Sequence, residues 1–199
     1  MSLTLAISTA SPALSLALFD GAALIVHDHR IIGRGHAEAL LPGIVQLMAG
    51  RRADAIIVDT GPGSFTGIRI GIAAARALGL AWGVPVTGCT GAALVAARAF
   101  AQAPLLAAVT VLLDAGRGLV LRQRVAADYC TSAIETSQPG ALAIADSEAT
   151  AGPLAPAGRG NRIHEGQPDA AFALHLPKAQ RDFPPQALYV RPPDAVLPL

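Results

Sequence analysis

The segment AIIVDTGPGSFTGIRIGIAAARALGLAWGVPVTGC, residues 55–89, decides the fold class of this chain. It begins with an apolar, β-branched run, Ala55–Asp59, which is typical of a buried parallel strand. A glycine-rich turn follows at Thr60–Gly67, and an apolar pattern of helical period then continues to about Trp82. Pro85–Gly88 has the composition of another strand. Strand, turn, helix and strand in this order predict a βαβ unit and therefore an α/β protein.

The flanking segments complete one lobe around this unit. Turn signals and short apolar runs predict three antiparallel strands at the start of the chain, at Leu3–Ser8, Leu14–Phe19 and Ala22–His27. Apolar residues at helical spacing predict one helix before the unit and one after it, at His36–Ala49 and Gly91–Ala103. The order βββαβαβα predicts an α/β lobe that spans residues 1–104.

The remaining residues, 105–199, carry weaker patterns. Val109–Asp114 and Leu119–Val125 predict a strand pair around a glycine-containing turn, in outline like the hairpin that opens the chain. From Ser137 onward the chain is rich in Pro and Gly, and its apolar runs are short. We therefore expect a smaller and incomplete second lobe, partly irregular.

Composition excludes several classes of function. Charged residues make up 15% of the 199 residues and the net charge is +1, so no overall field attracts nucleic acid or an anionic membrane. Cys89 and Cys130 show neither a disulfide framework nor a metal-ligand spacing, which indicates a reducing, cytoplasmic compartment. The apolar N-terminus lacks the basic region of a signal peptide, and Arg98, Gln102 and Pro104 interrupt the apolar stretch Ala92–Leu113. Neither secretion nor a membrane location is expected.

The glycine-rich turn is not a nucleotide-binding P-loop. It lies where the N-terminus of a helix can receive an anion. A P-loop, however, ends in Lys followed by Ser or Thr, whereas this turn ends in Phe65-Thr66-Gly67 with no lysine nearby.

The full set of motifs resembles the bacterial TsaB (YeaZ) family of the glycoprotease-like (peptidase M22) superfamily. The resemblance rests on GPGSFTGIRIGIAAARALGLAWGVPVTGC, preceded by HAEALLPGIVQLM and by the opening ISTASPALSLALFDG. VTVLLDAGRGLVL stands at the place of the family's second hairpin, and ALYVRPPD is similar to its C-terminal stretch. The likeness is dense from Leu3 to Leu113 and thin after Val125.

The resemblance implies both a fold and a function. The fold is actin-like and two-lobed, of the sugar kinase, Hsp70 and ribonuclease H-like type, here with a short, incomplete second lobe. The function is that of a non-catalytic subunit that supports a TsaD-like catalytic paralogue together with a TsaE-like ATPase. Such complexes install threonylcarbamoyl on the adenosine beside the anticodon of tRNAs, so this chain meets tRNA only through the complex. It binds no cofactor alone, any use of ATP belongs to the assembly, and it forms a homodimer when the partner is missing.

Two positions favour the role of partner over that of catalyst. TsaD-like enzymes carry a His-x-x-x-His metal pair, and the corresponding positions here are Gly91 and Val95, which cannot bind a metal. Actin-like ATPases place an aspartate on the opening strand, where this chain has Ser8. We therefore interpret Ser8, Thr9 and Asp114 as a vestigial phosphate loop.

Other polar groups have simpler structural explanations. In His27-Asp28-His29, adjacent residues on a strand point to opposite faces, which argues against a metal triad. His36 and Glu38 head a helix, where Glu38 complements the helix dipole. Asp114 stands at a turn, and turn formation explains it better than catalysis. No nucleophile and base pair suggests a protease.

A ridge of small residues is the predicted partner surface. Gly67, Gly71, Ala75, Gly79 and Gly83 recur every four residues, so they form one face of a helix onto which another helix could pack. The predicted interface adds four residues of the preceding helix: His36, Leu40, Leu41 and Ile44. The alternative is that the ridge packs against the protein's own sheet.

Two other functions remain open from the sequence. One is a stand-alone actin-like kinase or ATPase, against which Ser8 and the short second lobe argue. The other is a degenerate structural protein that only forms homodimers.

Overall fold

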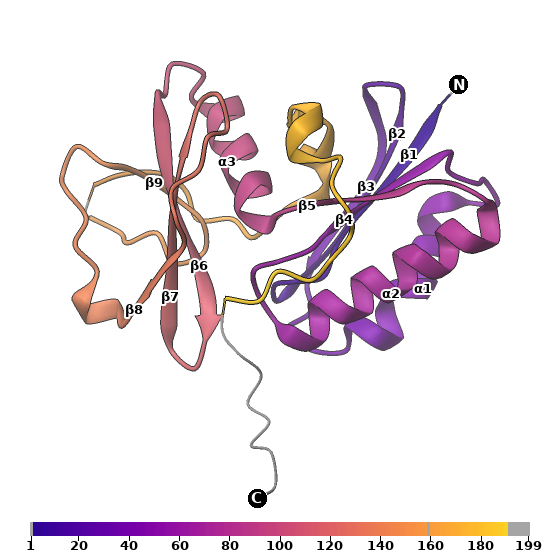
Figure 1. Ribbon diagram of the computed structural model, residues 1–199, viewed down its shortest axis with the longest axis horizontal. Coiled ribbons are helices and arrows are strands. Elements are labelled where there is room, and N and C mark those ends of the chain that lie inside the picture. The colour runs from indigo at the N-terminus through magenta and orange to yellow at the C-terminus, as the bar shows by residue number, and fades with distance from the viewer. Residues whose placement is uncertain (1, 159, 191–199) are drawn as a thin grey trace, which may run out of the picture.

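The computed structural model describes residues 2–158 and 160–190 and contains two β-sheets with helices on and between them (Figure 1). The first lobe contains β1 (Leu3–Ser8), β2 (Ala13–Asp20), β3 (Ala23–Ile31), α1 (His36–Met48), β4 (Ala55–Asp59), α2 (Phe65–Trp82), β5 (Val86–Cys89) and α3 (Gly91–Gln102). Then follow β6 (Ala108–Gly116), β7 (Leu119–Ala126), β8 (Glu135–Ser137), η1 (Pro139–Ala141), β9 (Ala149–Ala151), β10 (Asn161–His164), η2 (Ala170–His175) and η3 (Lys178–Gln180). The predicted order of elements in the first lobe is confirmed, and β3 runs longer than expected.

Both sheets have the same topology. The first has the strand order β3-β2-β1-β4-β5, in which three antiparallel strands are extended by two parallel ones. The second has the order β10-β9-β6-β7-β8, which is the same arrangement starting from β6. The fold is therefore the actin-like, duplicated α/β fold. The second lobe is incomplete in its helices rather than in its strands.

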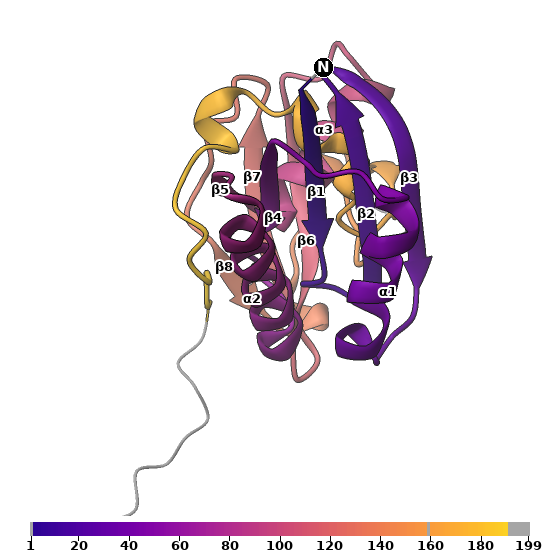
Figure 2. The same ribbon diagram turned by 90° about the vertical axis from the view of Figure 1, so that its right-hand side faces the viewer.

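The helices α1 and α2 lie side by side on one face of the first sheet (Figure 2). Alternate residues of the strands turn toward them, because side chains on a strand alternate between faces. Leu16 on β2 and Val58 on β4 belong to the core beneath these helices, as do Leu40 and Ile44 of α1. The helices are thus held by the strand pattern that the sequence predicted.

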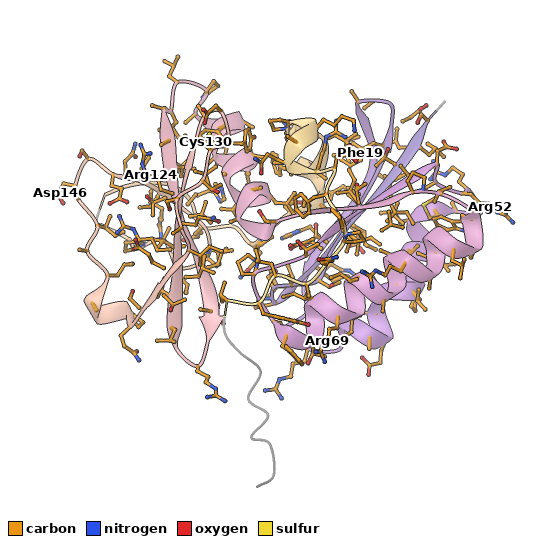
Figure 3. The ribbon with its side chains drawn as sticks, in the orientation of Figure 1. Phe19, Arg52, Arg69, Arg124, Cys130 and Asp146 are labelled. Carbon is orange, nitrogen blue, oxygen red and sulfur yellow. The ribbon has the colours of Figure 1, made fainter. Side chains whose placement is uncertain are left out.

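The opposite face of the first sheet is joined to the second sheet by α3 and η2. Phe19 of β2, labelled in Figure 3, shares this second core with Val111 of β6 and with a run of alanines in α3. Ala96 and Ala99 of α3 are fully buried. Such small side chains let the helix pack tightly between two sheets.

The chain returns to the first lobe after β10. The backbone N–H of Gly88 donates to Phe183 O at 2.7 Å, and Leu188 N–H donates to Thr60 O at 2.8 Å. Residues 183–190 therefore lie along β5 and the start of α2. The division of the chain at residues 104 and 105 stays a prediction.

In the part of the chain that the structure describes, no helix combines the length and apolar character needed to cross a bilayer.

Candidate functional site

A cleft of about 580 Å³ opens between the first hairpin of each sheet. Three parts of the chain form most of its wall: the β1–β2 turn, the segment that leads into α2, and the end of β6. The returning C-terminal segment closes one side. The lining residues are Ala10, Ser11, Pro12, Gly33, His36, Pro62, Gly63, Ser64, Phe65, Leu113, Asp114, Ala115, Gly116, Gln167, Pro168, Tyr189 and Val190.

The cleft wall is poorly equipped to hold a polyphosphate. Among the lining residues that the structure describes there is no Lys or Arg, so no side-chain cation faces phosphate oxygens there. The Asp114 carboxylate accepts a hydrogen bond from Gly116 N–H at 2.6 Å. This bond spans the register shift at the end of β6, directly before the turn to β7. His36 is buried, and its Nε2 lies 3.2 Å from Ala13 O.

Of the predicted vestigial phosphate loop, only Asp114 lines the cleft. Ser8 is fully buried, and its Oγ donates to Asp59 Oδ2 at 2.7 Å. Thr9 is also buried, and its Oγ1 donates to Gly67 O at 2.7 Å. The expectation that Ser8 and Thr9 join Asp114 in one loop is wrong, because both side chains turn inward to tie β1 to β4 and α2.

Asp59 is a polar group that the sequence reasoning passed over. It ends β4 beside Ser8, because β1 and β4 are parallel neighbours with Ile7 paired to Val58. Complete burial raises the pKa of the Asp59 carboxyl from its ordinary 3.8 to about 6. Hydrogen bonds from Ser8 and from the backbone of Gly61 and Gly91 act in the opposite direction. The sequence signal for this buried carboxyl is an aspartate at the end of an apolar strand.

The small-residue ridge of α2 is an intramolecular packing surface. A Cβ added at Gly67 would overlap Thr9 O, and one at Gly71 would overlap Thr9 Oγ1. At Gly79 it would overlap a methyl group of Val86. Ala75 is fully buried. These contacts correct the prediction of a partner interface: the ridge lets α2 approach β1, β4 and β5 closely.

The remaining residues of the predicted interface differ in how exposed they are. Gly83 forms the left-handed C-cap of α2, and a Cβ added there would meet no atom within 4 Å. His36, Leu40 and Ile44 are on the buried face of α1, so the prediction is wrong for them as well. Leu41 is 53% exposed and remains available to a partner.

The outer face of α1 and α2 carries exposed apolar side chains that the sequence reasoning did not single out. Val45 of α1 is 72% exposed, and Leu80 of α2 is 87% exposed. Together with Leu41 and Phe65 they lie on two helices that contact each other. We call Leu41, Val45, Phe65 and Leu80 the outer helix face. The four-residue spacing of Leu41 and Val45 could have indicated an apolar stripe on α1.

Arg69 anchors the returning chain at one end of this face, where Figure 3 labels it on α2. Its Nε donates to the Tyr189 hydroxyl at 2.8 Å, and its guanidinium lies 3.7 Å from the centre of the Phe65 ring. Arg76 donates to Pro185 O at 2.8 Å. The segment that carries Tyr189 thus packs along α2 as far as Arg76 and forms one wall of the cleft.

The two positions that correspond to the His-x-x-x-His pair lie in the interior. Gly91 and Val95 are buried in α3. Gly91 N–H donates to Gly61 O at 3.0 Å, and Val95 O lies 3.0 Å from His164 Nε2. Glu38 is exposed in the first turn of α1. It complements the helix dipole there, as expected.

Comparison with known proteins relates this chain to proteins of tRNA threonylcarbamoyladenosine biosynthesis. A family model described as TsaD, tRNA N6-adenosine threonylcarbamoyltransferase, matches residues 30–158. An uncharacterized protein of Mycobacterium tuberculosis is 32% identical over 98% of this chain and 94% of its own length. The tRNA threonylcarbamoyladenosine biosynthesis protein TsaB of Escherichia coli is 35% identical over 42% of this chain and 38% of that protein. The solved structure of YeaZ from Pseudomonas aeruginosa superposes with a TM-score of 0.73 at 27% identity, covering 88% of this chain and 90% of that one.

Proposed function

Because this chain belongs to the TsaB (YeaZ) family, we propose that it is the non-catalytic subunit of a cytoplasmic complex that modifies tRNA. Its role lies in the biosynthesis of tRNA threonylcarbamoyladenosine. In the proposed assembly a TsaD-like paralogue transfers the threonylcarbamoyl group to the adenosine beside the anticodon, and a TsaE-like ATPase uses ATP. The chain described here supports the paralogue and meets tRNA only through it.

The interior positions of Gly91 and Val95 carry the non-catalytic part of this proposal. A TsaD-like active site needs two histidines one helical turn apart, and here those positions are filled by a buried glycine and a buried valine, which offer no side-chain ligand to a metal. The cleft adds support, since its described lining residues supply no cation for phosphate binding. The cleft of this chain alone therefore lacks the positively charged side chains that usually bind the phosphates of a nucleotide.

The outer helix face is the surface that we assign to the TsaD-like partner. Leu41, Val45 and Leu80 expose apolar side chains on two helices that contact each other, and exposed apolar surface of this kind can mark an interaction site. A paralogue of the same fold presents an equivalent helix pair, and two such pairs can pack ridges into grooves. Without the paralogue, two copies of this chain can pair through the same face around a twofold axis.

Charge substitution on the outer helix face tests this assignment. We expect Val45→Glu and Leu80→Glu to change the free energy of unfolding by no more than about 0.5 kcal/mol, since both side chains face solvent. Both variants should lose co-purification with the TsaD-like partner and lose tRNA modification in a reconstituted reaction. The matched control is Leu105→Glu, which alters a fully exposed leucine in the loop between α3 and β6 and should bind normally.

Two outcomes would count against the proposal. If the Val45 and Leu80 variants bind the partner as tightly as the parent chain, the interface lies elsewhere. If the parent chain adds nothing to the rate of tRNA modification by the paralogue and the ATPase, the supporting role itself is wrong.

A further inference from the structure

Two histidines on β3 share one face of the first sheet. His27 and His29 are two residues apart, and side chains with this spacing on a strand point the same way. In the ladder between β2 and β3, His29 pairs with Ser15 and His27 pairs with Ala17. Ala17 belongs to the core under α3 and η2, so both imidazoles face that side and not the side of α1 and α2.

The chain brings an aspartate to the same place from more than a hundred residues away. Asp169 precedes η2, and its Oδ1 lies 2.8 Å from His27 Nε2 and 3.8 Å from His29 Nδ1. The Ser15 hydroxyl donates to the same oxygen at 3.1 Å, and Ala171 N–H donates to it at 2.9 Å. The carboxylate, 8% exposed, is therefore held in position by both the sheet and the start of η2.

One nitrogen of this cluster has no hydrogen-bond partner. Nδ1 of His29 is buried from solvent and makes no hydrogen bond among the described residues, although a buried polar atom is nearly always satisfied. The ligand atoms of His27, His29 and Asp169 all lie within 4.8 Å of one another. Two imidazole nitrogens and one carboxylate oxygen form a donor set that binds zinc and related divalent transition metals.

We propose that His27, His29 and Asp169 bind one zinc ion, which joins β3 of the first sheet to the segment that follows the second sheet. This site is independent of the proposed function and lies on the face of the sheet opposite the outer helix face.

The observed distances suit a tetrahedral ion after small side-chain movements. Metal–nitrogen distances of about 2.0 Å place tetrahedral ligand atoms about 3.3 Å apart. The two contacts to Asp169 Oδ1, at 2.8 and 3.8 Å, lie on either side of that value. His27 would exchange its hydrogen bond to Asp169 for a metal bond. Water can fill the fourth position, because the His27 side chain is 31% exposed.

The electrostatic surroundings favour neutral imidazole at His29. Burial lowers the pKa of His29, with smaller contributions in the same direction from His27 and Arg98 and opposite ones from Asp169 and Asp28. Metal binding needs the unprotonated ring, so this environment prepares the ligand. Asp28 points away to pair with Arg30 at 3.0 Å and is not part of the site. The positive charge of Arg98 disfavours a bound cation, and the negative charge of the Asp169 carboxylate offsets this effect.

Zinc titration of the full chain tests the site. Protein stripped with EDTA and dialysed is titrated with zinc chloride by calorimetry, and its melting temperature is followed as zinc is added. We expect one zinc per chain and a melting temperature that rises with zinc concentration, because an ion that binds only the folded state stabilises it. His27→Gln and His29→Gln should each raise the zinc dissociation constant at least 100-fold, beyond the 10- to 100-fold typical of outer-shell changes. His175→Gln, in an exposed histidine of η2 outside the cluster, is the matched control and should bind like the parent chain.

A second readout keeps the result independent of folding. Gln at position 27 can still donate to Asp169, so His27→Gln should melt like the parent chain in EDTA. Cobalt(II) added to the parent chain should give the visible absorption of a tetrahedral site, and this absorption should be lost in both cluster variants. The proposal is overturned if the parent chain binds no zinc, or if the variants bind zinc as tightly as the parent chain, since the ion then sits elsewhere.

Discussion

The two lobes share a strand order but differ in what covers their sheets. In the first, long helices fill the connections before and after β4, and α1 and α2 together cover one face. In the second, the corresponding connections contain only η1 and turns, so on the face turned away from α3 Leu112 of β6 and Val120 of β7 form only a small core with Ala155. The same strand order therefore forms with long helices in the connections between strands and without them.

The length of the connections explains this difference. A parallel crossover commonly needs a dozen or more residues, most often with a helix. Residues 60–85 give β4 and β5 enough chain for the long helix α2, whereas residues 152–160 between β9 and β10 do not. The helices of the first lobe carry the proposed partner surface. The second lobe contributes the end of β6 to the cleft wall.

The largest difference that we expect between the lobes is in the free energy of unfolding lost when a helical glycine is replaced by leucine. Leucine at Gly71 would overlap Thr9 beneath α2, so Gly71→Leu should lower the free energy of unfolding by about 3 kcal/mol through overpacking. Gly140 of η1 has no atom within 4 Å of an added Cβ, and Gly140→Leu should change stability by less than about 0.5 kcal/mol. Urea denaturation measures both. If the Gly71→Leu chain is as stable as the parent chain, the ridge does not pack against the sheet, and the predicted difference between the lobes is wrong.

A buried carboxyl gives the first lobe an unusual dependence on pH. The folded pKa of Asp59 is about 6, above its ordinary 3.8, so protonation favours the folded state. This stabilisation is fully present below pH 3.8 and is lost as the pH rises toward 6, by roughly 2 to 3 kcal/mol in all. Asp59→Asn, which cannot ionise, should remove that loss. Denaturation curves of both chains between pH 4 and pH 8 measure it, and parallel pH profiles would contradict the assignment to Asp59.

The second lobe should respond to pH with the opposite sign at Glu148. Burial raises the pKa of Glu148, but hydrogen bonds from Thr110 at 2.5 Å and Arg122 at 2.7 Å, with Ala145, bring it below its ordinary value. Its stabilisation is present above the ordinary pKa and is lost as the pH falls through the lower folded value. Glu148→Gln should therefore cost about 1 kcal/mol at pH 7 and less at pH 3. An equal cost at both pH values would mean that charge plays no part.

Local patterns determined most of the first lobe. The alternation in β1 and β2, the apolar run of β4 and the helical spacing of α1 and α2 each follow from contacts between neighbours in the chain, so their bounds were predicted closely. The three-residue strands β8 and β9 were not predicted. Strands this short carry no period of their own and form because longer neighbours offer them hydrogen bonds.

Assignment of the surfaces and sites needed the tertiary structure. The spacing of Gly67, Gly71 and Gly79 shows that something packs closely against α2, but a sheet and a partner helix require the same small residues. His27 and His29 were dismissed because Asp28 lies on the other face of β3, and no local pattern pairs them with Asp169. Ser8 and Asp59 likewise meet only because β1 and β4 are neighbours. Sequence by itself determined the elements and their amphipathic faces, since those depend on residues a few positions apart. Which face meets which, and which distant polar groups meet, depends on the relative placement of the elements, and only the tertiary structure decided it.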